Sequence, residues 1–501
     1  MMNFSGLLGI VLPAVLLVCT GCAALPKNDT YSVEAVCLEY GGHEQPPAAP
    51  SRLYETENRC LSKKDAETGL IFPLTLSQSL SIAHANNNNL EQTAFRIERS
   101  KAMQALANAA FRPQLNVYFE YMQGDAPSAY LFKKIDQRML PPNADFNDPG
   151  WFENYETGTG VQMNLFNGGR DYLAVQIAKQ EVRISLTDRK SAVNLLTARV
   201  IQAFYNVLEA EKYIQIAEES KKTVSEQLRI MQVRYEGGGA LKSDVLSLNV
   251  RLAESKENIV RARKHFQSAK AALANLMGLD PSVLTDSTEQ FVEPDQMAPD
   301  LPDTYEKGVF YALANRPELD KIRRRIAASR MEVDVARAEY LPRIDLQGKY
   351  YLDDPDLDFH RNRENWTAGL MLSWDLFTGF STEAKVDMAE AAVREVIAAG
   401  RQTVLDIKMD VKTAYLNHEA AKAAYRAARS SEISAEESYR LVERHYKGGA
   451  VTITRYLEAE LDLNRARIRV AAAHYEKIRA AADMTRAIGK WADPDGSALD
   501  E

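Results

Sequence analysis

Proline is absent from two long stretches of this 501-residue chain. None of the 19 prolines falls within 150–280 or 356–493. A proline inside a helix costs about 3 kcal/mol, because it removes a backbone N–H and its ring collides with the preceding turn. The absence therefore predicts very long helices in both stretches. The prolines crowded between 281 and 317 predict an irregular linker that joins two halves.

Other scarce features exclude several classes of protein. The net charge is −8, which argues against nucleic acid as a partner. No 18-residue apolar run follows the N-terminal segment, so we expect no membrane-spanning helix in the mature chain, although membrane strands are not excluded. The segment HEAAK at His418 lacks the second histidine of a zinc protease, and no phosphate-binding glycine loop follows a strand. We therefore expect no enzyme, no cofactor and no bound metal.

The N-terminus, MMNFSGLLGIVLPAVLLVCTGC, places an apolar core and small residues before Cys22. It resembles a bacterial lipoprotein signal peptide, in which the chain is cut before the cysteine and the thiol is acylated. This predicts a signal peptide at 1–21 and a lipidated extension at 22–72, anchored in lipid by acyl chains such as palmitate. The same resemblance implies sorting to the outer membrane, because Ala23, and not an aspartate, follows Cys22. An ordinary cleaved export signal is the alternative.

Only two cysteines, Cys37 and Cys60, remain after such processing. An exported protein meets an oxidising compartment, which favours a disulfide between them. Two separate buried thiols are the alternative. Neither cysteine has histidine partners at the spacing of a zinc site.

The chain contains two halves that repeat each other. LFNGG at Leu165 matches LFTGF at Leu376, 211 positions later, and FRPQLNVYFEY at Phe111 matches YLPRIDLQGKY at Tyr340, 229 positions later. A constant offset on either side of one insertion indicates duplication. We therefore expect a first structural repeat at 73–280, a linker at 281–302, a second repeat at 303–490 and a tail at 491–501.

Each half is predicted to hold one long helical hairpin. From Arg170 to Tyr235 the helix would be about 100 Å long at 1.5 Å per residue. It carries two apolar seams, one along Leu196, Val200, Ala203 and Val207 and one along Thr197, Ile201, Phe204 and Leu208, beside a polar stripe of Arg199, Gln202, Asn206 and Glu209. The glycines of RYEGGGALKSDVL and HYKGGAVTITRYL mark the two tips, because glycine accepts the positive φ that a tight turn between helices needs.

Four segments alternate apolar and polar residues, as strands with one apolar face do. The apolar positions are Leu115, Val117, Phe119 and Tyr121; Val161, Met163 and Leu165; Ile344, Leu346 and Tyr350; and Leu372, Trp374 and Leu376. We expect Trp151, Phe152, Tyr155 and Trp366 in an aromatic belt at the membrane interface, and a loop facing outward between Gln123 and Thr157. Four strands are too few to close a barrel in lipid, so several copies would have to pool them. A soluble four-stranded sheet is the alternative.

Together these features resemble the TolC-like outer-membrane efflux channels, of the lipidated kind, over roughly Leu74 to Ile488. The paired R-Y-x-x-G-x-x-x-x-x-D-V-L tips, the L-F-x-G turns and the duplication carry the resemblance. It implies a mainly α fold with a membrane β portion, in which antiparallel hairpins form an α-barrel and three chains pool four strands each into a twelve-stranded β-barrel. It also implies a homotrimeric channel of a tripartite efflux system that exports small molecules, drugs or metal ions. The partners would be a periplasmic adaptor protein and an inner-membrane RND or ABC transporter.

The resemblance gives the tips two roles. The residues expected to contact the adaptor are Arg234, Tyr235, Gly238, His445, Gly448 and Gly449. The residues expected to close the periplasmic entrance are Asp244, Tyr446, Arg455 and Glu458. Asp244 would pair with Arg455, Tyr446 would add a hydroxyl, and Glu458 would replace the acidic group that the motif has at the position of Arg455. Solvated charges at helix ends are the alternative.

Two other functions stay open. The exit channel of a type I protein secretion system would have the same pore and a different client. A periplasmic coiled-coil structural lipoprotein would have no membrane strands.

Overall fold

The computed structural model describes residues 73–285, 291–293 and 301–491. They belong to one compact unit, Lys63–Glu501. The expected signal peptide, Cys22, Cys37 and Cys60 lie outside the described residues. Within the described part, no helix has an apolar stretch long enough to cross a membrane.

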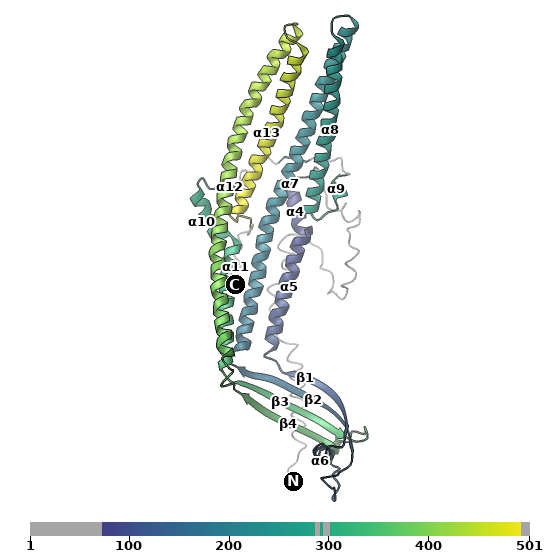
Figure 1. Ribbon diagram of the computed structural model, residues 1–501, viewed down its shortest axis with the longest axis vertical. Helices are drawn as coiled ribbons and strands as arrows, with labels where there is room; N and C mark the ends of the chain where they lie inside the picture. The colour runs from purple at the N-terminus through teal and green to yellow at the C-terminus, as the bar shows by residue number, and fades with distance from the viewer. Residues whose placement is uncertain (1–72, 286–290, 294–300, 492–501) are drawn as a thin grey trace. The chain divides into compact units, whose positions relative to one another are not determined.

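The elements come in two matching sets (Figure 1). The first set is α4 (Leu76–Asn86), α5 (Asn88–Ala109), β1 (Gln114–Gly124), α6 (Pro127–Asp136), β2 (Phe152–Asn167), α7 (Arg170–Glu236) and α8 (Lys242–Leu276). The second set is α10 (Tyr305–Asn315), α11 (Pro317–Arg337), the 3-10 helix η2 (Ala338–Tyr340), β3 (Arg343–Asp354), the 3-10 helix η3 (Arg361–Arg363), β4 (Glu364–Ser373), α12 (Ser381–Lys447) and α13 (Ile453–Ala487). Helices α7 and α12 both have 67 residues, and α8 and α13 both have 35. The equal lengths support the predicted two-fold repeat.

The predicted linker between the sets is not wholly irregular. It begins with a short helix, α9 (Pro281–Thr285). Beyond it, Phe291 forms an isolated parallel bridge with Leu74, just before α4. The linker therefore returns to the start of the first set.

The four strands form one antiparallel sheet in the order β1-β2-β3-β4 (Figure 1). The register places Leu115 opposite Val161, and Met163 opposite Leu346, so the predicted apolar positions share one face. The other face carries polar side chains. Strands β1 and β4 form the two edges.

The fourth predicted strand is partly wrong. Strand β4 ends at Ser373, so Trp374 and Leu376 lie beyond it. The indole N–H of Trp374 donates to the carbonyl of Tyr340, at 3.0 Å, at the end of η2. This contact fixes the segment to the end of a helix and takes it out of the ladder.

The segment between β1 and β2 also differs from the predicted loop, because it contains α6. The ammonium of Lys133 in α6 forms ion pairs with the carboxylates of Glu156 in β2, at 2.5 Å, and Asp353 in β3, at 3.0 Å. Helix α6 therefore lies on the polar face of the sheet. Phe152, expected in the aromatic belt, is buried, since it shares this face with Glu156.

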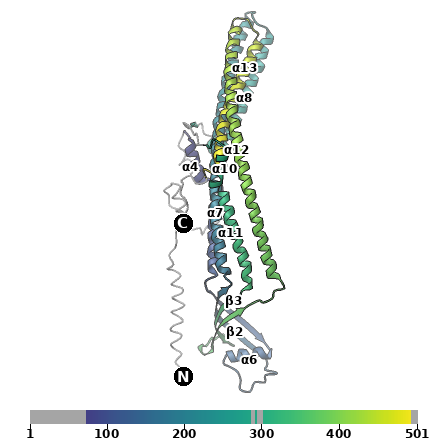
Figure 2. The same ribbon diagram turned by 90° about the vertical axis from the view of Figure 1, so that its left-hand side faces the viewer.

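Helix α7 is the central element of the helical part. It packs against α5, α8, α11 and α13, and α11 lies between α7 and α12 (Figure 2). Both predicted seams are buried, and Val200, Phe204 and Val207 are fully so. The predicted polar stripe is wrong at Glu209, which is buried because Arg479 of α13 and the Tyr213 hydroxyl bind its carboxylate.

A second ionic contact ties the second set together. The Asp410 carboxylate of α12 accepts hydrogen bonds from Arg316, at 2.7 Å, and from Arg486 of α13, at 2.8 Å. Burial opposes ionisation of Asp410, but the two guanidinium groups outweigh it and hold the pKa of this carboxyl below its usual value.

Candidate channel gate at the hairpin tips

The two hairpin turns have the same backbone geometry. Helix α7 ends at Glu236, and the N–H of Gly239 donates to the carbonyl of Arg234 at 2.7 Å; in the second turn, Ala450 donates to His445 at 2.8 Å. One glycine in each turn has a positive φ, +76° at Gly238 and +74° at Gly449. This is the left-handed residue that ends many helices. The glycines therefore form tight turns, as predicted, although only one in each turn needs the unusual φ.

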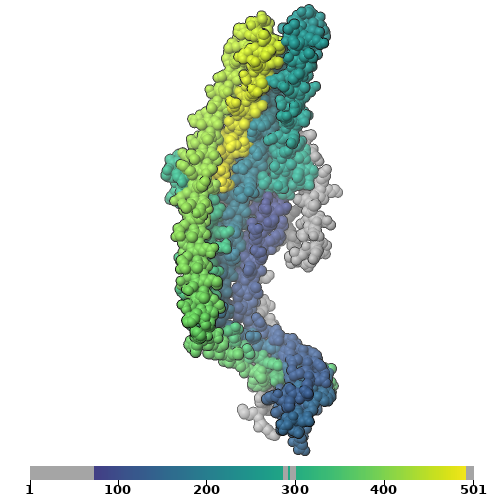
Figure 3. Space-filling model, viewed as in Figure 1, coloured from purple at the N-terminus to yellow at the C-terminus, as the bar shows by residue number. Residues whose placement is uncertain are grey.

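The tips of the two hairpins pack against each other (Figure 3). They share one apolar cluster, formed by Val224, Leu228 and Met231 of α7, Leu248 of α8, Tyr446 of α12, and Ile453 and Tyr456 of α13. All four long helices contribute to it. The cluster closes the gap between the two repeats at their far end.

Tyr446 lies at the centre of this contact. Its ring stacks on Tyr456, with 4.9 Å between centroids, and the guanidinium of Arg234 lies 5.9 Å from its centroid. Burial raises the pKa of Tyr446, while Arg234 lowers this pKa and the Asp244 carboxylate raises it. Tyr446 thus brings together residues from both predicted tips.

The Tyr446 hydroxyl itself is buried without a hydrogen-bond partner among the described residues. The resemblance predicts that this hydroxyl joins a polar contact at the entrance. Within this chain the hydroxyl therefore joins no polar contact, and a contact of Tyr446 with a neighbouring copy stays a prediction. The ring, not the hydroxyl, makes the contact.

Of the predicted charges at the entrance, Arg455 and Glu458 are exposed and Asp244 is half-buried. Arg455 forms an ion pair with Glu458, 3.3 Å away and one helical turn along α13, and Asp244 forms no ion pair with Arg455 within the described chain. Asp244 instead lies near Tyr446, whose pKa responds to it. A pair of Asp244 with Arg455 between neighbouring copies stays a prediction.

A polar contact between the hairpins escaped the sequence analysis. Glu460 of α13 is buried and accepts a hydrogen bond from Ser220 of α7 at 2.7 Å, and Asn464 donates to Ser220 at 3.0 Å. Glu460 lies one helical turn after Tyr456, at a seam position where an apolar residue is usual. A carboxylate at such a position was the signal that could have revealed this contact.

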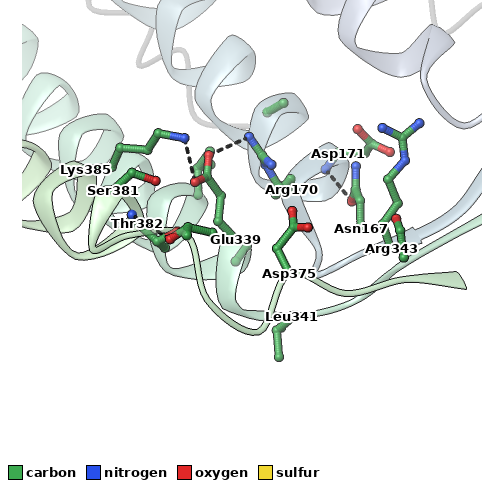
Figure 4. A pocket seen from close by; sticks show the side chains of 15 residues that line it. Asn167, Arg170, Asp171, Glu339, Leu341, Arg343, Asp375, Ser381, Thr382 and Lys385 are labelled. Carbon is green, nitrogen blue, oxygen red and sulfur yellow. Dashed lines mark hydrogen bonds and ion pairs between the residues drawn. The ribbon is translucent and has the colours of Figure 1, made fainter.

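At the opposite ends of α7 and α12, next to the sheet, lies a polar cavity of about 850 Å³ (Figure 4). Glu339 bridges two cations there, Arg170 at 3.3 Å and Lys385 at 2.8 Å. The bridge ties the first turns of the two long helices to each other. No group of three or more metal-binding side chains occurs among the residues that the structure describes.

Comparison with known proteins decides the family. The model of the outer membrane efflux protein family matches residues 79–279 and 311–490, which lie in the two repeats. The chain belongs to this family. The predicted resemblance to outer-membrane efflux channels is thereby confirmed, and so are the mainly helical fold with four antiparallel strands and the efflux-channel function.

Relatives of this outer membrane efflux protein include both efflux and secretion channels. The alkaline protease secretion protein AprF of Pseudomonas aeruginosa is 27% identical over 326 residues, which span 64% of this chain and 64% of AprF. The pyoverdine export outer membrane protein OpmQ of Pseudomonas putida is 22% identical over 83% of this chain and 85% of OpmQ. The crystal structure of the CmeC outer membrane channel of Campylobacter jejuni has the same fold, with a TM-score of 0.71 at 18% identity over 83% of this chain and 85% of CmeC.

Proposed function

We propose that three copies of this chain form one conduit through the outer membrane and the periplasm, and that it exports small molecules. The observation that carries the proposal is the incomplete sheet. Its apolar face is exposed, with Val117 at 75% and Leu370 at 69%, and β1 and β4 leave both edges unpaired in the described chain. Open edges are excluded from lipid, where no water satisfies the backbone, so copies must complete one another. Four strands from each of three copies give a barrel of ordinary size.

The hairpin tips are the proposed contact with a periplasmic adaptor, which would connect the channel to an inner-membrane transporter. Several apolar side chains around the first tip are exposed: Val233, Tyr235, Leu241, Leu246 and Val250. Exposed apolar groups that gather at one end of an element favour a protein partner. Arg234, Tyr235, Gly238, His445, Gly448 and Gly449 keep their proposed role in this contact.

We place the proposed gate at the same hairpin tips, at the periplasmic end of the channel. Asp244, Arg455 and Glu458 are its polar members, and Tyr446 contributes its ring. An exposed ion pair contributes only about 0–1 kcal/mol, so an adaptor would need little free energy to separate such contacts between copies.

The second candidate function is the exit channel of a type I secretion system. It is supported by the similarity to AprF, which is named an alkaline protease secretion protein. A structural lipoprotein without membrane strands is opposed by the four-stranded sheet. Identifying the inner-membrane transporter that co-purifies with the chain distinguishes efflux from secretion. An RND pump would support efflux, and an ABC exporter together with a bound protein client would support secretion.

The N-terminal assignments remain proposals. We propose cleavage after residue 21, acylation of Cys22, a disulfide between Cys37 and Cys60, and the division into two repeats joined by 281–302. Mass spectrometry of the mature N-terminal peptide tests the first three at once. An unmodified Cys22, or two free thiols, would contradict the corresponding assignment.

The channel is tested in planar bilayers with the purified full chain. We expect discrete conductance steps that are small in the wild type and larger when Asp244→Ala and Arg455→Ala are combined. Lys242→Ala, an exposed charge on the same tip, is the matched control and should leave the conductance unchanged. Absence of any conductance would contradict the proposed function, whereas unchanged steps in the double variant would remove only these two residues from the gate.

A further inference from the structure

The polar side of helix α6 packs on the sheet, and the apolar side of the helix is uncovered in the described chain. Tyr130, Lys133 and Gln137, at helical spacing, are the side that meets the sheet, and the Gln137 amide donates to the Asn154 side chain at 2.8 Å. Phe132, 66% exposed, and Ile135 lie about half a turn away. An amphipathic helix normally packs the other way round, with its apolar stripe inward. The reversed orientation requires an explanation.

The polar side of α6 is firmly attached. The Glu156 carboxylate, which Lys133 binds, is buried and also binds Lys349 at 2.6 Å and the Tyr118 hydroxyl at 2.6 Å. Just after the helix, the Arg138 guanidinium donates to the Asn365 side chain of β4 at 3.1 Å. Contacts to several strands therefore fix the direction in which the apolar side points. It points away from the polar face of the sheet.

In the proposed trimer the apolar face of the sheet meets lipid, so the polar face lines the channel. Twelve strands about 4.8 Å apart and tilted by about 40° enclose a barrel roughly 24 Å across. A helix with its side chains is about 10–12 Å across. Three α6 helices on the inner wall would therefore reach one another at the axis.

We propose that the apolar side of α6 binds the α6 helices of the other two copies and closes the outer end of the channel. The proposal rests on the proposed trimer. Helix α6 follows the end of β1 that is remote from α5, so it lies at the opposite end of the sheet from the long helices. It gives the channel a second closure, far from the hairpin tips. Phe132 and Ile135 are its contact residues, and Lys133 holds the helix in place.

Cysteine cross-linking in the full chain tests this contact, with Cys37 and Cys60 replaced by serine. Phe132→Cys should yield disulfide-linked dimers after mild oxidation, in up to about two thirds of the chains, because three thiols at one axis form one bond. The matched control is Phe146→Cys, which is 55% exposed in the same loop but outside α6, and should yield none. Intact conducting trimers without a Phe132→Cys dimer would overturn the inference alone. Loss of trimers and conductance from the parent chain would overturn the proposed function as well.

A labelling experiment measures the closure itself and does not depend on the tips. Gln347→Cys places a thiol on the polar face of β3, deeper in the proposed channel than α6. We expect an impermeant maleimide added to intact cells to label it about tenfold faster when Phe132→Ser and Ile135→Ser are combined. Phe146→Ser should leave the rate unchanged. Equal rates in all three backgrounds would overturn the proposal, because α6 would then not obstruct the mouth.

Discussion

At the scale of single residues, the glycines of the hairpin turns differ in what the backbone requires of them. Gly238 and Gly449 have positive φ, whereas Gly237 and Gly448 have φ of −81° and −79°. A Cβ costs about 1–2 kcal/mol in the left-handed region. No atom lies within 4 Å of a Cβ at Gly238 or Gly449, so backbone strain alone would set the effect there.

We therefore expect Gly238→Ala to speed amide hydrogen exchange in the first turn by about 5–30-fold, as 1–2 kcal/mol of local destabilisation implies. Gly237→Ala is the control at the neighbouring position, where any residue is tolerated, and should slow exchange or leave it unchanged. Mass spectrometry of exchanged peptides measures both. Equal effects at the two positions would show that the turn does not have this geometry.

Two variants of Tyr446 distinguish the contribution of packing from that of hydrogen bonding at the tips. Tyr446→Phe removes a buried hydroxyl without a partner among the described residues, so stability should stay the same or rise by about 1 kcal/mol, with unchanged conductance. Tyr446→Ala removes the ring from the cluster and should cost about 3 kcal/mol and enlarge the conductance steps. Thermal unfolding and bilayer recording measure the two variants. If Tyr446→Phe opened the channel as far as Tyr446→Ala, the hydroxyl would have to bind a neighbouring copy.

At the scale of elements, a few ionic contacts fix helices that lie far apart in the sequence. Asp410 is one, because Arg316, α12 and α13 meet at its carboxylate. Since its pKa is lowered, the folded state gains stability above the ordinary pKa of 3.8 and loses it as the pH falls through the lower pKa of the folded state. Asp410→Asn should thus cost about 2 kcal/mol at pH 7, and the difference from wild type should shrink as the pH falls below 3.8. Thermal unfolding at several pH values tests this, and a difference that does not depend on pH would contradict it.

Lys133 fixes α6 to the sheet through its ionic contacts with Glu156 and Asp353. Removing one partner of a buried ionic contact costs about 3 kcal/mol or more, so Lys133→Gln should release α6 and expose it to protease cleavage at Arg138. Lys134→Gln removes the same charge from the same helix, but the Lys134 ammonium donates to the side chain of Gln137, just after the last residue of α6, and not to the sheet. The control should therefore keep its protection. Equal cleavage of both variants would show that Lys133 does not hold the helix.

The elements differ in how far the sequence predicts them. Periodicity is long and regular in α7 and α12, and the duplication supports each half with the other, so the hairpins and most of the sheet are predictable. Helix α6 was missed because it is short, starts at Pro127 and exposes its apolar side, which is the reverse of the usual pattern. Glu209 was misplaced because its partner Arg479 lies 270 positions away, and no local pattern reports such a contact.

The turns at which we place the proposed gate were predictable, but the contacts around them were not. The motif places both tips correctly, since turn geometry is local. Which side chains meet there depends on how two hairpins of different repeats pack, and that packing buried Tyr446 and left Asp244 and Arg455 apart. Contacts between copies are still harder to predict from the sequence, because they depend also on how whole chains pack together.

At the scale of the whole molecule, one chain holds parts of a channel that it cannot complete. The sheet has two open edges and an exposed apolar face, and in the proposed trimer the hairpins form one segment of the wall. The two proposed closures are at opposite ends, the tips in the periplasm and α6 at the outer mouth. Both need neighbouring copies.

Native mass spectrometry of the particle extracted in detergent tests the assembly most directly. Our account predicts a single species of three mature chains, which persists when the detergent is stripped in the gas phase. A monomer, or a dimer, as the dominant species at the concentrations that give conductance would contradict it, since neither could close the edges of the sheet.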